Sequence, residues 1–256
     1  MHVLLTNDDG IYAPGIFAAY KELKRYAEVT VVAPDSEKSS VGHGITLAHP
    51  LWVKHVHRRE EFFGYSVTGT PADCVKLALS VLLKKKPDLV ISGINFGDND
   101  GCSVFYSGTV AGAREGALMG IPAMAVSLAA YSDPDFSYAA KCTAELAKIA
   151  KKYLKAMPKG TFLNVNVPHK KASQIKGFRV THQGTTPIHG TFNRRQDPKL
   201  KNYYWMSGKL PKHPKKLNVD TDALAAGYVT ITPIQSDLTN YSFLDELRSW
   251  SPKFVG

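Results

Sequence analysis

The residues with the clearest potential for chemistry are two adjacent carboxylates, Asp8 and Asp9, which follow the short apolar run Val3-Leu4-Leu5. A continuous apolar run of this length is typical of a parallel strand that is covered on both faces. Ligands of open α/β sheets gather beyond the carboxyl ends of such strands, so we expect both carboxylates at the mouth of a site. A plain turn is the alternative interpretation, because Asn7-Asp8-Asp9-Gly10 is also good turn chemistry.

Two further polar loops are expected at the same edge of the sheet, after the second and third buried strands. Together with the first loop they offer a set of mainly hard oxygen donors: Asp8, Asp9, Ser39 or Ser40, His43, Asn95 and Asn99. Such donors favour Mg²⁺, Mn²⁺ or Ca²⁺ over zinc. The histidine is equally open to interpretation as an ordinary loop or core residue, because isolated motif residues often mislead.

A candidate phosphate site follows at Ser107-Gly108-Thr109, where a helix is expected to begin. Backbone N–H groups and the positive end of the helix dipole make such a start favourable for a phosphate. A divalent cation beside a phosphate site indicates phosphoryl chemistry, in which a carboxylate takes a proton from the attacking water. A phosphatase that works through a covalent phosphate on Asp8 is a rival mechanism. Neither a dinucleotide-binding nor a Walker-type glycine motif occurs.

Alternating strand and helix patterns must position these groups. Strands are expected near residues 3–6, 28–33, 88–92, 123–127, 162–168 and 227–233, and helices near 14–24, 70–86, 107–119, 136–154 and 241–250. This order predicts an α/β fold with a doubly wound, mostly parallel sheet of the Rossmann-like kind. Residues 52–57 alternate as in a β-hairpin, which we expect to leave the main sheet.

The pattern fails after about residue 184, and we expect a catalytic domain at 1–180 and a small appended region at 181–256. Residues 193–216 carry eight basic residues against one acid, with Tyr203, Tyr204 and Trp205 among them. Basic and aromatic residues together can bind single-stranded nucleic acid. The alternative, which we favour, is an arm that places its aromatic side chains on a neighbouring subunit, so we expect no stable nucleic-acid partner.

Composition sets broad limits on the function. The 256 residues include 44% hydrophobic and 21% charged residues, which is ordinary for a globular protein. The formal charge of +10 favours anionic partners such as nucleotides or polyphosphate. Three separated cysteines predict neither a disulfide framework nor a thiolate zinc site. With no export signal or membrane span apparent, a cytoplasmic protein without a membrane partner is expected.

Six ordered motifs in this chain closely resemble those of the SurE survival-protein nucleotidases. They are residues 6–10, 33–43, 68–75, 92–95, 107–109 and 228–233. The resemblance implies a hydrolase that removes phosphate from nucleoside 5′- and 3′-monophosphates, a 5′-nucleotidase with some exopolyphosphatase activity. It also implies one divalent cation, magnesium or manganese, held by Asp8, Asp9, Ser39 and Asn95, which selects Ser39 over Ser40. Exchanged C-terminal segments would give a homodimer or homotetramer.

Two departures from the family pattern concern the substrate. Phe96 stands where the family usually has a basic residue, and Tyr106 where a histidine is common. Each is one residue from a group expected to bind metal or phosphate. We therefore expect Phe96 and Tyr106 to line the mouth of the site and to stack on the nucleobase, which would give broad base specificity. Asn99, His43, Ser107, Gly108 and Thr109 complete the set expected to bind substrate or phosphate.

Overall fold

The computed structural model describes residues 1–153, 156–187, 190–208 and 216–250. Up to β7 the elements are β1 His2–Thr6, α1 Pro14–Leu23, β2 Glu28–Pro34, β3 Val53–Arg58, β4 Glu61–Val67, α2 Pro71–Leu77, the π-helical turn η1 Ala78–Leu82, β5 Leu89–Phe96, the 3-10 turn η2 Gly101–Phe105, α3 Gly108–Leu118, β6 Ala123–Ala129, α4 Ser137–Tyr153 and β7 Thr161–Pro168. The later elements are the 3-10 turn η4 Ala172–Gln174, β8 Phe178–Val180, β9 Gly190–Gln196, β10 Asn202–Gly208, α5 Asp220–Ala225, β11 Val229–Gln235, the 3-10 turn η5 Tyr241–Phe243 and α6 Leu244–Ser249.

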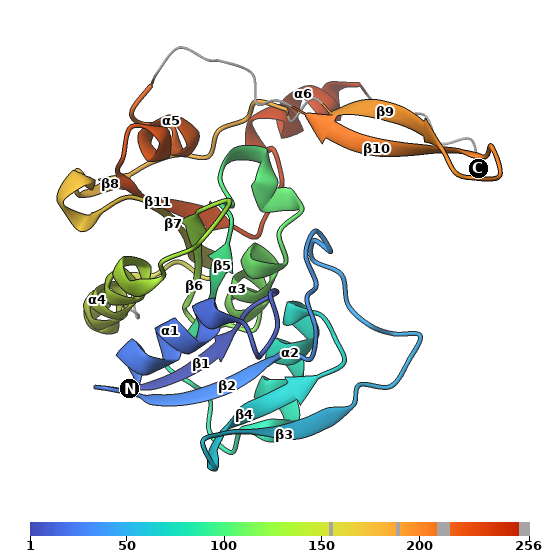
Figure 1. The fold of residues 1–256 in the computed structure, drawn as a ribbon. Helices are drawn as coiled ribbons and strands as arrows, with labels where there is room; N and C mark the ends of the chain where they lie inside the picture. The colour runs from blue at the N-terminus through green and yellow to red at the C-terminus, as the bar shows by residue number, and fades with distance from the viewer. Residues whose placement is uncertain (154–155, 188–189, 209–215, 251–256) are drawn as a thin grey trace, which may run out of the picture.

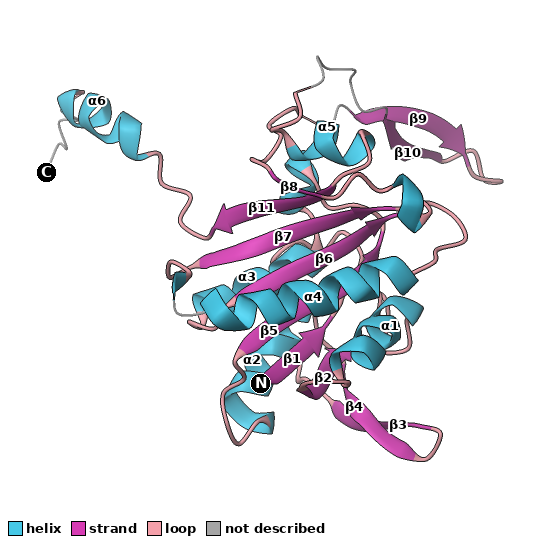
Figure 2. Cartoon of the chain, turned by 90° about the vertical axis from the view of Figure 1, so that its left-hand side faces the viewer, coloured by secondary structure: helices cyan, strands magenta, loops and turns pink. Residues whose placement is uncertain are grey.

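A nine-stranded sheet in the order β3-β4-β2-β1-β5-β6-β7-β11-β8 forms the centre of the molecule (Figure 1). The six strands from β4 to β7 in this order run parallel, whereas β3 and β11 are antiparallel to β4 and β7 respectively. Helices α1 and α4 cover one face, and α2 and α3 cover the other (Figure 2). The predicted doubly wound, mostly parallel α/β fold is confirmed.

The apolar run of β1 is continuous because both faces of the sheet are covered. Val3 and Leu5 belong to the core beneath α1 and α4, and Leu4 belongs to the core beneath α2 and α3. All three side chains are fully buried. Since burial of such a side chain contributes about 1.5–3 kcal/mol, this strand is a fixed base for the residues that follow it.

Helix α3 lies unusually close to the sheet. A Cβ on Gly112 would come within 2.7 Å of the Ser92 hydroxyl oxygen on β5. The small residues of this helix therefore let its backbone approach the strands. Its first turn is brought to the carboxyl end of β1 as a result.

Three expectations about the elements need correction. The hairpin near residues 52–57 does not leave the main sheet, because β4 pairs in parallel with β2 and β3 forms the edge. Strand β5 continues past residue 92 to Phe96 with a register shift, so Asn95 lies on a strand rather than in a loop. The helical region after Thr70 ends at Leu82, four residues before the expected end near residue 86.

The last quarter of the chain is divided between the sheet and two projecting segments. Strand β11 pairs with β7, so residue 180 is not a boundary of the sheet. Strands β9 and β10 form a separate two-stranded antiparallel hairpin, which occupies part of the basic and aromatic segment where no regular element was expected. Figure 2 shows this hairpin and α6 projecting from different ends of the molecule. Residues 209–215 of that segment lie outside the described part of the chain.

Candidate active site

The two carboxylates lie in a turn at the carboxyl end of β1. The Asn7 side-chain amide donates to the Gly10 carbonyl oxygen at 2.9 Å and closes this turn. Asp8 is 3% exposed, and its backbone carbonyl accepts a hydrogen bond from the Lys38 N–H at 2.7 Å. Asn7-Asp8-Asp9-Gly10 therefore forms a turn, and this turn places both carboxylates at the edge of the sheet where a site was expected.

Asp8 is attached to the start of α3 through Thr109. Its Oδ2 accepts from the Thr109 N–H at 2.9 Å, and its Oδ1 accepts from the Thr109 hydroxyl. A Cβ on Gly108 would lie 2.8 Å from the Asp8 Cβ, so only glycine permits this approach. Burial raises the pKa of Asp8 above its usual value, and the Thr109 hydrogen bonds partly oppose this rise. Asp8 is consequently fixed in position by the helix.

Asp9 connects the end of β1 to the end of β5. Its Oδ2 accepts from the Phe96 N–H at 3.0 Å. Burial, and next the charge of Asp8, raise the pKa of Asp9 to about 7. A carboxylate with a pKa near neutrality is suited to accept a proton in a reaction at physiological pH.

The loop after β2 brings Ser39 and a further acid to this edge. Ser39 is exposed, and its hydroxyl donates to Glu37 Oε1 at 2.6 Å. The charge of Glu37 contributes to the raised pKa of both Asp8 and Asp9, which places it near them. Sequence reasoning missed Glu37, although its position two residues before Ser39 in a strand-end loop was an available signal.

His43 and Asn99 are both held by other protein groups. The His43 Nε2 lies 2.8 Å from Glu115 Oε2 on α3, and the Lys76 amine donates to the other oxygen of this buried carboxylate at 2.8 Å. The Asn99 side chain donates to the Ser127 hydroxyl at 2.8 Å, and its N–H donates to Asn166 Oδ1 at 2.8 Å. These contacts fix the loops at the edge of the sheet, and nothing in the sequence indicated Glu115.

The first turn of α3 has few donors left for a phosphate. Ser107 is the N-cap, and its hydroxyl oxygen accepts from the Val110 N–H at 3.1 Å. The Ser107 N–H donates to the Ser103 carbonyl, and the Thr109 N–H is used by Asp8. Within the described part of the chain, the Gly108 N–H makes no hydrogen bond. The Gly108 N–H and the Ser107 hydroxyl hydrogen are therefore the groups that a phosphate would meet.

The oxygen donors at this edge fit a divalent cation. Asn95 is 8% exposed, and because its Nδ2 donates to the Gly97 carbonyl at 2.8 Å, its Oδ1 remains as an acceptor. A buried and a half-buried carboxylate side by side, both with raised pKa values, would be stabilised by a cation. The described residues contain no metal-binding cluster of three or more His, Cys, Asp or Glu side chains. Asp8 and Asp9 would therefore need neutral oxygen ligands, namely Asn95 and Ser39.

Phe96 and Tyr106 are both exposed aromatic residues of this region, as is Phe105 beside Tyr106. Phe96 is 42% and Tyr106 is 60% exposed, and each follows or precedes a residue of the site directly. The Tyr106 carbonyl accepts from the Gly42 N–H at 2.9 Å, so the loop after β2 runs alongside the loop before α3. Both rings are available to a ligand that reaches this edge.

Fold and site together define a doubly wound α/β protein with a carboxylate-lined site at the carboxyl edge of its parallel strands, beside a helix start. The family model of survival protein SurE matches residues 3–189. The chain belongs to the SurE family, and the resemblance drawn from its motifs is confirmed. Among the described helices, none combines the length and apolar character needed to cross a bilayer.

Similar proteins match along their full length. The 5′-nucleotidase SurE of Syntrophobacter fumaroxidans is 47% identical over 251 residues, covering 98% of this chain and 100% of that protein. The 5′-nucleotidase SurE of Natranaerobius thermophilus is 49% identical over 255 residues, with 98% of each chain covered. The crystal structure of the SurE protein from Aquifex aeolicus has a TM-score of 0.84 and 40% identity, and the match covers 98% of this chain and 100% of that one.

Proposed function

We propose that this protein is a 5′-nucleotidase, a divalent-metal-dependent phosphoric monoester hydrolase that converts nucleoside 5′- and 3′-monophosphates to nucleosides and phosphate. Full-length similarity to proteins named 5′-nucleotidase SurE supports the reaction class. The observation that carries the proposal is the attachment of Asp8 to Thr109, because it brings the two adjacent carboxylates to the first turn of α3. Acidic ligands and a phosphate-binding helix start are then adjacent.

The cation would be one Mg²⁺ or Mn²⁺ per chain, held by Asp8, Asp9, Asn95 and Ser39. When bound, it neutralises charge on the phosphate and assists the attack of water. We assign the role of general base to Asp9, because its Oδ1 accepts no hydrogen bond within the described residues and so keeps a lone pair for the proton. Both oxygens of Asp8 accept hydrogen bonds from Thr109, so Asp8 is poorly placed to form a covalent phosphate.

The substrate would enter between the exposed aromatic rings and the start of α3. The Ser107 hydroxyl and the Gly108 N–H would bind the phosphate, while Phe96 and Tyr106 would stack on the base without selecting among bases. His43 and Asn99 would act as positioning residues, because their side chains are held by Glu115 and Ser127. Exopolyphosphatase activity at the same site is part of this proposal, since a terminal phosphate of a polyphosphate presents similar chemistry.

A homodimer or homotetramer, assembled through the projecting segments of residues 181–256, completes the proposal. An isolated two-stranded hairpin is marginally stable in water, yet β9 and β10 expose Phe192, Tyr204 and Trp205 by 66%, 58% and 61%. Helix α6 has no buried residue, and Leu247 on this helix and Trp250 directly after it are both exposed. Apolar surface of this kind usually marks an interface. The working location would be the cytoplasm.

Phosphate release from a panel of nucleoside monophosphates and polyphosphate, measured with Mg²⁺, Mn²⁺, Zn²⁺ or EDTA, tests the proposed activity. We expect release from every nucleoside 5′-monophosphate with Mg²⁺ or Mn²⁺ and none with EDTA. Undiminished release in EDTA would remove the metal from the mechanism. Retention of RNA or DNA without any phosphate release would favour the nucleic-acid interpretation of the arm, and that retention should fall steeply with salt.

A further inference from the structure

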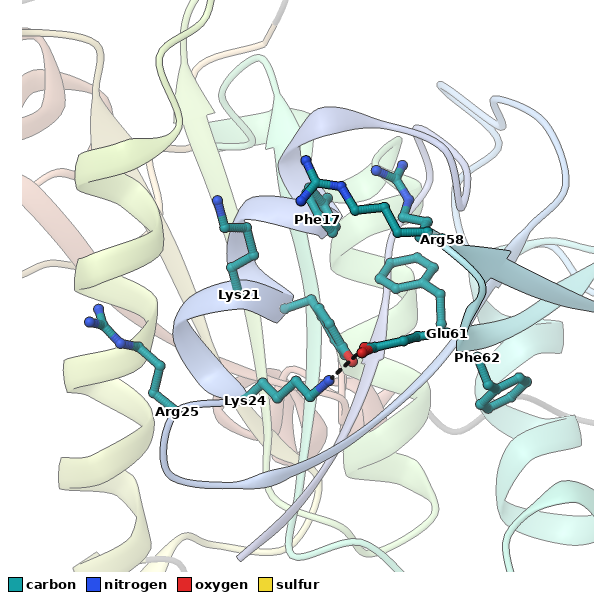
Figure 3. Close-up of a pocket in the computed structure, with 10 residues that line it drawn as sticks. Phe17, Lys21, Lys24, Arg25, Arg58, Glu61 and Phe62 are labelled. Atoms are coloured by element: carbon teal, nitrogen blue, oxygen red, sulfur yellow. Dashed lines mark ion pairs between the residues drawn. The ribbon is translucent and has the colours of Figure 1, made fainter.

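A cavity of about 700 Å³ lies away from the candidate active site, between α1 and the β3–β4 hairpin (Figure 3). Arg58 and Glu61 are opposite one another in the β3–β4 register, at the tip of that hairpin. Strand β4 runs parallel to β2. The tip is therefore at the amino-terminal edge of the parallel strands, opposite the edge that carries Asp8. None of the residues assigned to the candidate active site lines this cavity.

Aromatic side chains form the floor of the cavity. The Phe63 ring lies edge-on to the Phe17 and Tyr20 rings, with centroid distances of 5.9 and 5.0 Å. Phe63 is only 4% exposed and belongs to the core beneath α1. This floor is rigid, and its low polarity strengthens electrostatic interactions at its surface.

Cations dominate the rim of the cavity. One comes from α1, two follow directly after this helix and two come from the hairpin, and Figure 3 labels all of them except Arg59. The five are Lys21, Lys24, Arg25, Arg58 and Arg59. Glu61 is the one acidic residue in the lining and pairs with Lys24 at 3.6 Å, while Arg25 pairs with Glu22 at 3.0 Å. Lys21, Arg58 and Arg59 are thus left without an ion pair among the described residues. The cavity therefore offers an anionic ligand an excess of positive charge.

Arg58 is preorganised for such a ligand. Its guanidinium carbon lies 4.3 Å from the Phe17 ring centroid and 5.1 Å from that of Phe63. One terminal nitrogen donates to the Tyr12 carbonyl at 3.1 Å, whereas the buried Nε has no hydrogen-bond partner. A ligand cannot reach this buried Nε, but the second terminal nitrogen makes no hydrogen bond among the described residues and is free to donate to a charged acceptor. Solvated surface charge does not explain a guanidinium held in this way.

We propose that this cavity is a second, non-catalytic anion site that binds a chain of phosphate groups, such as a nucleoside triphosphate or short inorganic polyphosphate carries. Several negative charges are needed to match several unpaired cations, and a single carboxylate supplies too few. Guanidinium groups bind phosphate oxygens through paired, directional hydrogen bonds. Stacking of Arg58 on two rings fixes the orientation of those donors before the ligand arrives.

Calorimetric titration of inorganic tripolyphosphate into the full chain, with EDTA at about 0.15 M salt, tests this proposal under conditions that screen weak surface attraction. The variant Lys21→Gln/Arg58→Gln/Arg59→Gln should weaken binding by at least about tenfold, because it removes charge-assisted hydrogen bonds. The matched control Lys84→Gln/Lys85→Gln/Lys86→Gln removes the same charge from exposed lysines elsewhere and should change affinity by less than about twofold. If the first variant does not fold, Lys21→Glu/Arg59→Glu replaces it in the titration, because this variant leaves the contacts of Arg58 intact. It should weaken binding in the same way.

The outcomes separate this site from the candidate active site. Binding should persist in Asp8→Asn, and its loss there would assign the ligand to the carboxylate edge and overturn the proposal. Equal weakening in the lysine control, or absence of saturable binding to the unmodified chain, would also overturn it. A second titration with ATP distinguishes the two sources of a phosphate chain. Similar affinity for ATP and tripolyphosphate indicates that the phosphate chain alone is recognised. Tighter binding of ATP indicates that the natural ligand is a nucleoside triphosphate. Adenosine that competes as well as ATP would contradict phosphate recognition.

Discussion

Both carboxylate oxygens of Asp8 accept hydrogen bonds from a single residue, Thr109, which lies 101 positions later in the chain. The contact joins the carboxyl end of β1 to the first turn of α3. It brings two motifs that are far apart in sequence together at one edge of the sheet. It also makes the Thr109 hydroxyl a direct means of testing how precisely Asp8 must be held.

Thr109→Val removes the hydroxyl and keeps the backbone N–H and the shape of the side chain. A hydrogen bond to a charged group contributes about 1.5–3 kcal/mol, so we expect kcat/KM for a nucleoside 5′-monophosphate to fall by about 10- to 100-fold. Thr109→Ser restores the hydroxyl and should stay within about threefold of the unmodified chain. Equal loss in both variants would mean that the methyl group, not the hydrogen bond, is required.

Phe96→Ala tests the proposed stacking on the nucleobase. Stacking contributes about 1–3 kcal/mol and does not depend on which base is present, so KM should rise for all nucleoside monophosphates together. Turnover of a small phosphate ester without a base should be almost unchanged, which is the sign of lost uniform binding. If kcat for the small ester collapsed, or if one base alone were affected, Phe96 would have another role.

Replacement of Tyr204 and Trp205 by serine in the β9–β10 hairpin tests its role in assembly. Both side chains are more than half exposed in the isolated chain, and we expect the variant to lose subunits as measured by light scattering. Replacing Arg194 and Arg195 by glutamine on the facing strand is the control, because it changes charge and leaves the aromatic surface intact. An oligomer of unchanged size in the aromatic variant, combined with lost retention of nucleic acid, would favour the alternative role of this arm.

We expect Asp73 to contribute to the stability of the fold in a pH-dependent way that is independent of catalysis. Burial raises its pKa, but hydrogen bonds from Thr46 and from its capping partner Thr70 outweigh this effect and lower the pKa below the usual value. The stabilisation is therefore present above the unfolded pKa of about 3.9 and is lost as pH falls through the folded value. Asp73→Asn should cost about 1–3 kcal/mol at pH 7, and much less at pH 3, in chemical denaturation. A difference that did not change with pH would contradict this assignment.

The sequence predicted the central layers well, because burial imposes a clear pattern there. The continuous run of β1 and the proline-led starts of α1 and α2 correspond to elements of the structure. The hairpin of β9 and β10 was missed as a regular element since every residue of β9 is exposed, and no alternation of buried and exposed residues marks it. The continuation of β5 to Phe96 was missed because glycine within Ser92-Gly93-Ile94-Asn95 suggested a loop.

Parts of the candidate site were predictable for a similar reason. Parallel strands end at one edge, so the motifs containing Asp8 and Asn95 had to approach one another. Pairing of β1 with β5 and the contact of Asp9 with Phe96 realise this approach. Glu37 was not predicted although its position beside Ser39 was a signal, and Glu115 was not predicted because a single glutamate in a helix gives no sign of its partners. The α1 cavity was missed for the same reason, since its cations come from segments more than thirty residues apart.

The central claim is that Asp8 and Asp9, with Asn95 and Ser39, hold one divalent cation on which phosphate release depends. Equilibrium dialysis against Mn²⁺ tests this most directly, with the unmodified chain, Asp9→Asn, Ser39→Ala and Ser40→Ala compared side by side. We predict one Mn²⁺ per chain, bound at least about tenfold more weakly in Asp9→Asn, weakened to a smaller degree in Ser39→Ala, and unchanged in Ser40→Ala. Undiminished Mn²⁺ binding by Asp9→Asn, or equal effects of the two serine variants, would contradict the proposed metal site.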